Sequence, residues 1–77
     1  MTIETTAYAV YETRLGKDNS KTIKRFETES SARAYFHRKV RGYEQRGYTR
    51  SGSPFDITFV KRDETVLLKF RRIVFEQ

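Results

Sequence analysis

The sequence predicts an α+β fold in which two β-hairpins are joined through one helix, in the order ββαββ. Two observations carry this prediction. Short segments of alternating apolar and polar residues flank turn-forming residues, and one long central segment has its apolar residues at helical spacing. Because one helix cannot cover both faces of a sheet, we expect an antiparallel sheet of about four strands with the helix packed on one face.

The first hairpin is predicted over residues 6–27. Thr6–Leu15 is rich in Ala, Val, Tyr and Thr and alternates with a period of two, which is typical of a strand. Turn-forming and polar residues follow at 16–20. Lys21–Glu27 is the second predicted strand, although Ile23 and Phe26 are out of phase. Either a bulge lies between these two residues or one of them faces solvent.

The central segment predicts a helix over Ser30–Arg46. Thr28 or Ser30 is a suitable N-cap residue, and Glu29 lies near the positive end of the helix dipole. The residues of the predicted apolar stripe are spaced four, four, three and four apart, so they share one side of the helix. They are Ala32, Phe36, Val40, Tyr43 and Gly47.

The end of this helix is also predicted. Gly47 stands where a left-handed residue closes a helix, and Tyr48 is placed to pack back on Tyr43, as in a Schellman turn. Gly42 lies inside the helix and is expected to cost about 1 kcal/mol relative to alanine.

The second hairpin is predicted after a breaker cluster at Arg50–Pro54. Residues 55–60 alternate cleanly and form a half-buried strand, and Thr65–Phe75 returns as the longest strand. The phase of this last strand changes midway, so we expect a bulge near Arg71 and Arg72.

The length of 77 residues allows a single domain over residues 1–77, with 1–5 expected to be disordered. Cysteine is absent, which excludes a disulfide framework. No apolar run is long enough to cross a membrane, and the first residues do not have the pattern of a signal peptide. We therefore expect a cytoplasmic protein, of the cell or of an infected host.

The charge of the chain is concentrated in its middle. The net charge is +6, and the block 29–50 supplies +4 of it, with six basic residues against two acidic ones. Such a local excess on one predicted helix is the pattern expected of an electrostatic binding surface, although basic surfaces also serve solubility.

The residues do not provide the groups that catalysis needs. His37 is the only histidine, and no carboxylate stands three or four residues away to orient it as a base. Asp63 and Glu64 are adjacent at a hairpin tip, and the glycines are scattered. We expect no enzyme activity, no cofactor and no metal site.

Non-specific nucleic-acid binding is the function that the basic residues favour most, because Lys and Arg contacts to phosphate supply most non-specific affinity. Tyr11, Tyr35 and Tyr48 are candidate stacking surfaces if they prove exposed. The predicted binding residues are Arg33, His37, Arg38, Arg41 and Arg46 of the helix, and Lys21, Lys24 and Arg25 of the second strand.

One group of residues between positions 12 and 48 follows a pattern of turn, phenylalanine, helix and terminal Gly-Tyr. These residues are Thr13-Arg14-Leu15-Gly16-Lys17, Lys21, Phe26, Ser31-Ala32, Phe36, Lys39 and Gly47-Tyr48. In this pattern the segment resembles the WGR domain, with Leu15 at the position of the tryptophan that gives the domain its name. The resemblance implies a module of nucleic-acid-processing proteins that contacts DNA.

The alternative function is a protein-interaction module. Small cysteine-free domains with a single sheet resemble compact phage and mobile-element proteins, including some anti-CRISPR proteins, which inhibit a host complex. In that case the basic surface would bind an acidic protein or a nucleic-acid-binding complex. A homodimer through an edge strand is a further expectation.

Overall fold

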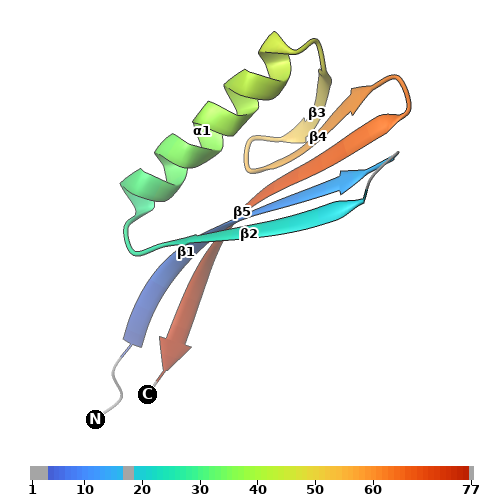
Figure 1. Cartoon of the computed structure of the whole chain (residues 1–77). Coiled ribbons are helices and arrows are strands. Elements are labelled where there is room, and N and C mark those ends of the chain that lie inside the picture. The colour runs from blue at the N-terminus through green and yellow to red at the C-terminus, as the bar shows by residue number, and fades with distance from the viewer. Residues whose placement is uncertain (1–3, 17–18, 77) are drawn as a thin grey trace.

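The computed structural model describes residues 4–16 and 19–76, and it confirms the α+β class. The strands form one antiparallel sheet in the order β2-β1-β5-β4-β3, and α1 lies on one face of it (Figure 1). The pair at the centre of the sheet, β1 and β5, brings the two ends of the chain together. The elements are β1 Glu4–Leu15, β2 Ser20–Phe26, α1 Glu29–Gln45, β3 Thr49–Ser53, β4 Asp56–Lys61 and β5 Glu64–Glu76.

The sheet has five strands where the sequence predicts about four. The additional strand is β3, which lies in the segment predicted as a breaker cluster, and it pairs with β4 from Thr49 opposite Val60 to Ser53 opposite Asp56. All of its side chains are exposed, so it has no apolar alternation to reveal it. Gly52 has a positive φ of 104°, and a Cβ there would lie 2.4 Å from the carbonyl oxygen of Asp56. Glycine thus allows β3 and β4 to approach closely.

The two predicted bulges are absent. The pairing of β1 with β2 runs without interruption from Tyr8 opposite Phe26 to Arg14 opposite Ser20. Ile23 therefore faces solvent, with 48% of its surface exposed. The pairing of β1 with β5 is likewise continuous from residue 4 opposite 76 to residue 15 opposite 65. The phase change in β5 needs no bulge, because Ile73 lies on the other face of the sheet.

The ends of α1 follow the predicted chemistry. Thr28 is the N-cap, with extended backbone angles, and its hydroxyl oxygen accepts a hydrogen bond from the Ser31 N–H at 3.3 Å. At the other end Gly47 has a φ of 89°. The N–H of Gly47 donates to the Glu44 carbonyl and the N–H of Tyr48 to the Tyr43 carbonyl, the two bonds of a Schellman turn.

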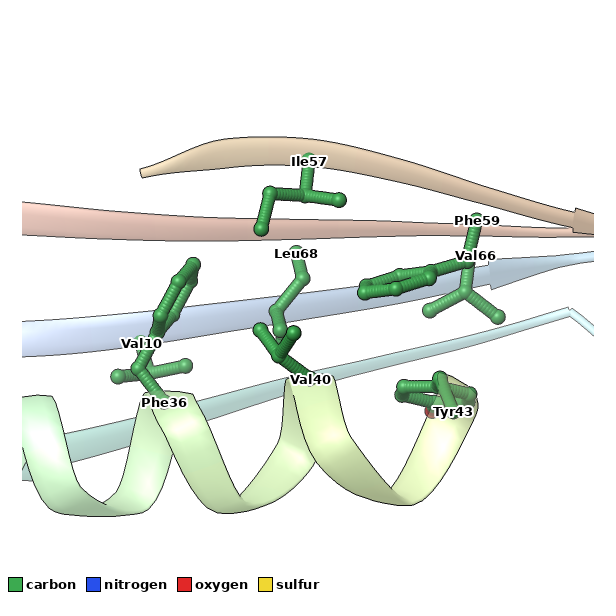
Figure 2. Packing of buried hydrophobic residues seen from close by; sticks show 8 residues of the cluster. All are labelled: Val10, Phe36, Val40, Tyr43, Ile57, Phe59, Val66 and Leu68. Carbon is green, nitrogen blue, oxygen red and sulfur yellow. The ribbon is translucent and has the colours of Figure 1, made fainter. Parts of the chain in front are cut away.

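The hydrophobic core lies between α1 and the face of the sheet that it covers. The predicted helical stripe supplies Ala32, Phe36, Val40 and Tyr43, all of them buried. Alternate residues of β1, β4 and β5 meet this stripe, as Figure 2 shows. The cluster consists of Val10, Phe36, Val40, Tyr43, Ile57, Phe59, Val66 and Leu68.

The opposite face of the sheet is not covered by any described element (Figure 1). We call it the open face. Its residues alternate with those of the core along each strand and are matched across strands by the pairing register. On β2, β1 and β5 it includes Lys21, Ile23, Arg25, Ala9, Tyr11, Thr13, Leu67, Lys69, Arg71 and Ile73.

The molecule is elongated, measuring 52 × 22 × 17 Å. Its radius of gyration of 14.2 Å exceeds the value of about 11.5 Å expected for a compact chain of this length. The cause is a two-stranded arm, residues 4–7 of β1 and 73–76 of β5, which projects beyond α1 in Figure 1. Strand β1 thus begins two residues earlier than predicted, and the rest of the expected disordered end, residues 1–3, lies outside the described residues.

No helix in the described part of the chain combines the length and the apolar character needed to span a membrane.

Candidate nucleic-acid interface

The predicted binding residues of α1 are all exposed and spread around the side of the helix that faces away from the core. Arg33 pairs with Glu29 at 2.8 Å, and its guanidinium lies 5.4 Å from the centre of the Phe55 ring. His37 is exposed, with its ring set edge-on against Phe36. Arg41 is exposed near these residues on the outward side of the helix. Arg33 thus already has a carboxylate partner on its own helix, in a solvent-exposed pair.

Arg38 is three residues from Arg41 and is its neighbour on the exposed side of the helix. Together with Lys39, Gly42, Tyr43 and Arg46 it lines a small groove of about 80 Å³. The Arg46 guanidinium lies 5.5 Å from the centre of the Tyr43 ring. The basic side chains of the helix therefore spread from its outward side to this groove.

The three predicted residues of β2 are divided between the two faces of the sheet. Lys24 pairs with Val10 of the core and therefore points to the side of α1. Lys21 and Arg25 pair with Thr13 and Ala9 and lie on the open face. The structure therefore separates Lys21 and Arg25 from the helix residues with which they were grouped.

Instead, Lys21 and Arg25 join basic residues of β5 on the open face. The pairing register places Arg25, Ala9 and Arg71 in one row across β2, β1 and β5. The next row is Ile23, Tyr11 and Lys69. The third row is Lys21, Thr13 and Leu67. Each row thus carries at least one cation.

Tyr11 lies at the centre of these rows. It is half-buried and has no aromatic neighbour among the described residues. Strand spacings place the surrounding cations within an area of roughly 10 × 13 Å. A shallow depression of about 260 Å³ lies here, lined by Tyr11, Thr13, Lys21, Leu67, Lys69 and Arg71.

Ala9 shows how closely the arginines lie on this face. It is on the open face but is completely inaccessible to solvent. Arg25 and Arg71 flank it in the same row, and the apolar stems of such side chains cover a small neighbour while their charged ends stay in water. The two guanidinium groups are therefore presented to solvent on either side of β1.

Within residues 4–16 and 19–76, no ion pair involves a cation of the open face. Three ion pairs join described residues, Arg33–Glu29, Lys39–Glu12 and Arg50–Glu44, and each of them involves a residue of α1. On the open face Asp56 is the cross-strand neighbour of Lys69, and no ion pair joins these two. Four cations of the open face therefore remain available to an anionic partner, and among the described residues Arg38, Arg41 and Arg46 of the helix segment are also without an ion pair.

The other two candidate stacking tyrosines are occupied within the fold. The Tyr35 ring packs on Phe26 at 5.3 Å between centres, and the Lys39 ammonium lies 5.7 Å from it. Tyr48 packs edge-on against Tyr43 and donates a hydrogen bond to Glu64 at 2.7 Å. This bond is the main reason why the pKa of Tyr48 is raised. Tyr11 is thus the best placed of the three to stack on a ligand.

A buried polar pair anchors the helix-side groove. Glu12 is only 8% exposed, and the Tyr43 hydroxyl donates a hydrogen bond of 2.7 Å to its carboxylate. Lys39 lies 3.4 Å from the same carboxylate oxygen. Burial, with the nearby carboxylate, raises the pKa of Tyr43 to about 12. The Arg14 guanidinium is 6.0 Å from the centre of the Tyr43 ring, so β1 adds a further cation beside the groove.

Sequence reasoning missed Lys69 and Arg71 as site residues. They alternate with Val66, Leu68 and Phe70 of the core face, so period-two counting already places them on the opposite face. What the sequence does not show is that β5 pairs with β1, and this pairing brings them beside Tyr11.

No protein-family model, no curated protein and no solved structure matches the chain. The resemblance to the WGR domain therefore stays a prediction.

Proposed function

We propose that this protein binds single-stranded nucleic acid without sequence preference, and that the open face is its main contact surface. The observation that carries the proposal is the group of four cations around Tyr11 without an ion pair among the described residues. These cations are Lys21, Arg25, Lys69 and Arg71.

The chemistry of the open face suits a flexible polyanion. Its cations would neutralise phosphates and release their counterions, which is the main source of non-specific affinity. Tyr11 would stack on a base, and the exposed Ile23 beside it would add apolar contact. A single strand favours this arrangement, because its bases are free to lie on a sheet while a duplex keeps them stacked inside.

The test measures binding of a fluorescently labelled oligonucleotide by anisotropy at several salt concentrations, with single-stranded and duplex DNA and RNA. The wild-type protein is expected to bind single strands most tightly, with affinity falling steeply as salt rises. The double variant Lys69→Gln/Arg71→Gln should bind more weakly. Its log–log salt slope should be smaller by about 1.4, which corresponds to about 0.7 for each lost phosphate contact on a single strand.

Two further variants make the result specific to the open face. Tyr11→Leu should weaken binding by about fivefold or more with the salt slope unchanged, because stacking on an aromatic ring contributes about 1–3 kcal/mol per base. Arg33→Gln/Arg41→Gln removes the same charge from the outward side of α1 and serves as the matched control. A loss in this control as large as in the Lys69/Arg71 variant would move the interface to the helix. Absence of any binding at low salt would refute the proposed function.

The alternative of a protein-interaction module makes a different prediction. A pull-down from a lysate treated with nuclease would then retain one specific protein, while the labelled oligonucleotides would not bind.

A further inference from the structure

A second feature lies on the other side of the sheet, in a groove formed by residues near the end of α1. Its walls are Arg38, Lys39, Gly42, Tyr43 and Arg46, so every charged residue lining it is a cation. Arg14 of β1 approaches from the sheet side, near the Tyr43 ring. The groove volume of about 80 Å³ suits a small group and not a whole base.

The charge in this groove is only partly compensated. Glu12 lies beneath it, almost completely buried, and is already bound by Lys39 and by the Tyr43 hydroxyl. Among the described residues Arg38 and Arg46 have no carboxylate partner. The last carbonyls of the helix, which would repel an anion, are also occupied. Those of Tyr43 and Glu44 accept bonds from the Schellman turn, and that of Arg46 accepts one from Lys61.

Gly42 is an independent observation that points to a ligand. It sits in the middle of α1, where glycine costs about 1 kcal/mol relative to alanine. Packing does not explain it, because a Cβ at this position would have no atom within 4 Å. The Gly42 carbonyl is already bonded by the Arg46 N–H, so what this glycine provides is space for a small group beside the neighbouring side chains of the groove.

We propose that this groove binds one phosphate group of the nucleic-acid backbone, held between Arg38 and Arg46 in the space left free at Gly42. Guanidinium groups suit this ligand because their fixed forks of N–H donors match phosphate oxygens. That the phosphate belongs to a nucleic acid rests on the proposed function, whereas the phosphate site itself does not. The helix packs on β2, the edge strand of the sheet, through Tyr35 and Phe26, so a nucleic-acid strand passing over that edge would reach both surfaces.

The first experiment follows the backbone amides of the isotope-labelled protein by NMR during a titration with inorganic phosphate. Chloride at equal ionic strength is the control. The expected result is a saturable shift concentrated at Gly42, Tyr43 and Arg46. Shifts that are absent, or that match those caused by chloride, would overturn the proposal.

The second experiment fills the groove without changing charge. Gly42→Gln adds a neutral side chain where the structure has open space, so the variant is expected to fold. Ala34→Gln places the same side chain on an exposed position about 12 Å away along the helix and is the matched control. Gly42→Gln should abolish the phosphate shifts and reduce the salt slope for a single-stranded oligonucleotide by about 0.7. Equal slopes for the two variants would contradict the assignment to nucleic acid.

The two proposals fail in different ways. If no oligonucleotide binds but phosphate still shifts the groove amides, the nucleic-acid function is wrong and the phosphate chemistry of the groove stands. If oligonucleotides bind and the groove amides respond to neither ligand, the groove proposal is wrong and the open face remains.

Discussion

Glu12 is a carboxylate on the core face of β1, between Val10 and Arg14 on that face and opposite Leu68 of β5. Alternation places Tyr8, Val10 and Glu12 on one face of the strand, and in the structure this is the face that packs against α1. A buried carboxylate needs partners, because leaving a charge unpaired away from water is costly. Tyr43 and Lys39 of α1 provide them, so the residue that looks least suited to the core joins the helix to the sheet.

Tyr43→Phe tests the contribution of this pair to stability. The variant removes the hydroxyl donor and leaves part of the carboxylate unsatisfied, so the free energy of unfolding should fall by about 1–3 kcal/mol at neutral pH, as measured by urea denaturation. The wild-type protein should also lose stability as the pH rises from about 10 towards 12. The folded state holds the Tyr43 proton more tightly than the unfolded chain, where the pKa is near 10.0, so this contribution is complete below pH 10.

The control for this prediction is Tyr48→Phe, which removes an exposed hydroxyl bonded to Glu64. It should change the stability at neutral pH much less than Tyr43→Phe does. The difference in stability between wild type and Tyr43→Phe should shrink between pH 10 and 12, because over this range the unfolded chain gives up the Tyr43 proton while the folded state, with a pKa of about 12, still holds it. A difference that stays constant over this range would show that the hydroxyl does not hold its proton more tightly after folding.

At the scale of the element, α1 is the part of the molecule that the sequence predicts best. Its apolar stripe, its Gly47 end and the contact of Tyr48 with Tyr43 are all confirmed, and Thr28 is the N-cap of the two residues considered. The prediction of α1 is strong because a long segment with helical periodicity and the residues at both of its ends indicate the same helix.

Substitution by alanine should have opposite effects on stability at Gly42, inside α1, and at Gly47, just after its end. Gly42→Ala should stabilise the protein by up to about 1 kcal/mol, since alanine is the better helix former and its Cβ meets no atom within 4 Å. Gly47→Ala should destabilise it by about 1–2 kcal/mol, because φ is 89° there and a side chain is disfavoured in that conformation. Urea unfolding of both variants measures the two effects. A loss of stability in Gly42→Ala would mean that the glycine has a structural role in the helix.

The strands were less predictable than the helix, for identifiable reasons. An edge strand such as β3 buries nothing, so it leaves no alternation in the sequence. The bulges were inferred from the assumption that all apolar residues face one core. Ile23 and Ile73 instead lie on the open face, and only the pairing register reveals this.

The candidate site also combines two kinds of information. Alternation along a strand can be predicted from the sequence, and the pairing between strands cannot. Lys21, Arg25 and Tyr11 are recognisable from the sequence as basic or stacking residues, but their grouping depends on which strands are neighbours. Because β1 pairs with β5, residues more than fifty positions apart in the chain, such as Tyr11 and Lys69, meet on one face. No local pattern predicts that contact.

At the scale of the whole molecule, the sheet separates two basic surfaces that are both close to β2. The helix side carries the ion pairs and the groove, and the open face carries cations that have no ion pair among the described residues. The excess charge of the helix segment in the sequence is therefore a poor guide to the available charge. Acidic residues of α1 and β1 neutralise part of it, and no described ion pair does so on the open face.

The elongated shape leads to the last prediction, which concerns the arm. Residues 4–7 and 73–76 pair only with each other, beyond the reach of β2 and β4. Two-stranded ribbons are marginally stable alone, and Val74 leaves 46% of its surface in solvent. In hydrogen exchange of the native protein, amides of Thr6 and Val74 should therefore exchange far faster than those of Val10 and Leu68 in the core.

The dependence of these exchange rates on protein concentration shows whether the arm stands alone or pairs with a second copy of the protein. If the arm stands alone, the rates at Thr6 and Val74 will be the same in dilute and concentrated samples. If a second copy pairs with its free edges, as the expected homodimer through an edge strand requires, these amides will become protected as the protein concentration rises. Protection equal to that of the core in the most dilute sample would contradict the prediction, because the two-stranded arm would then be as stable as the five-stranded sheet from which it projects.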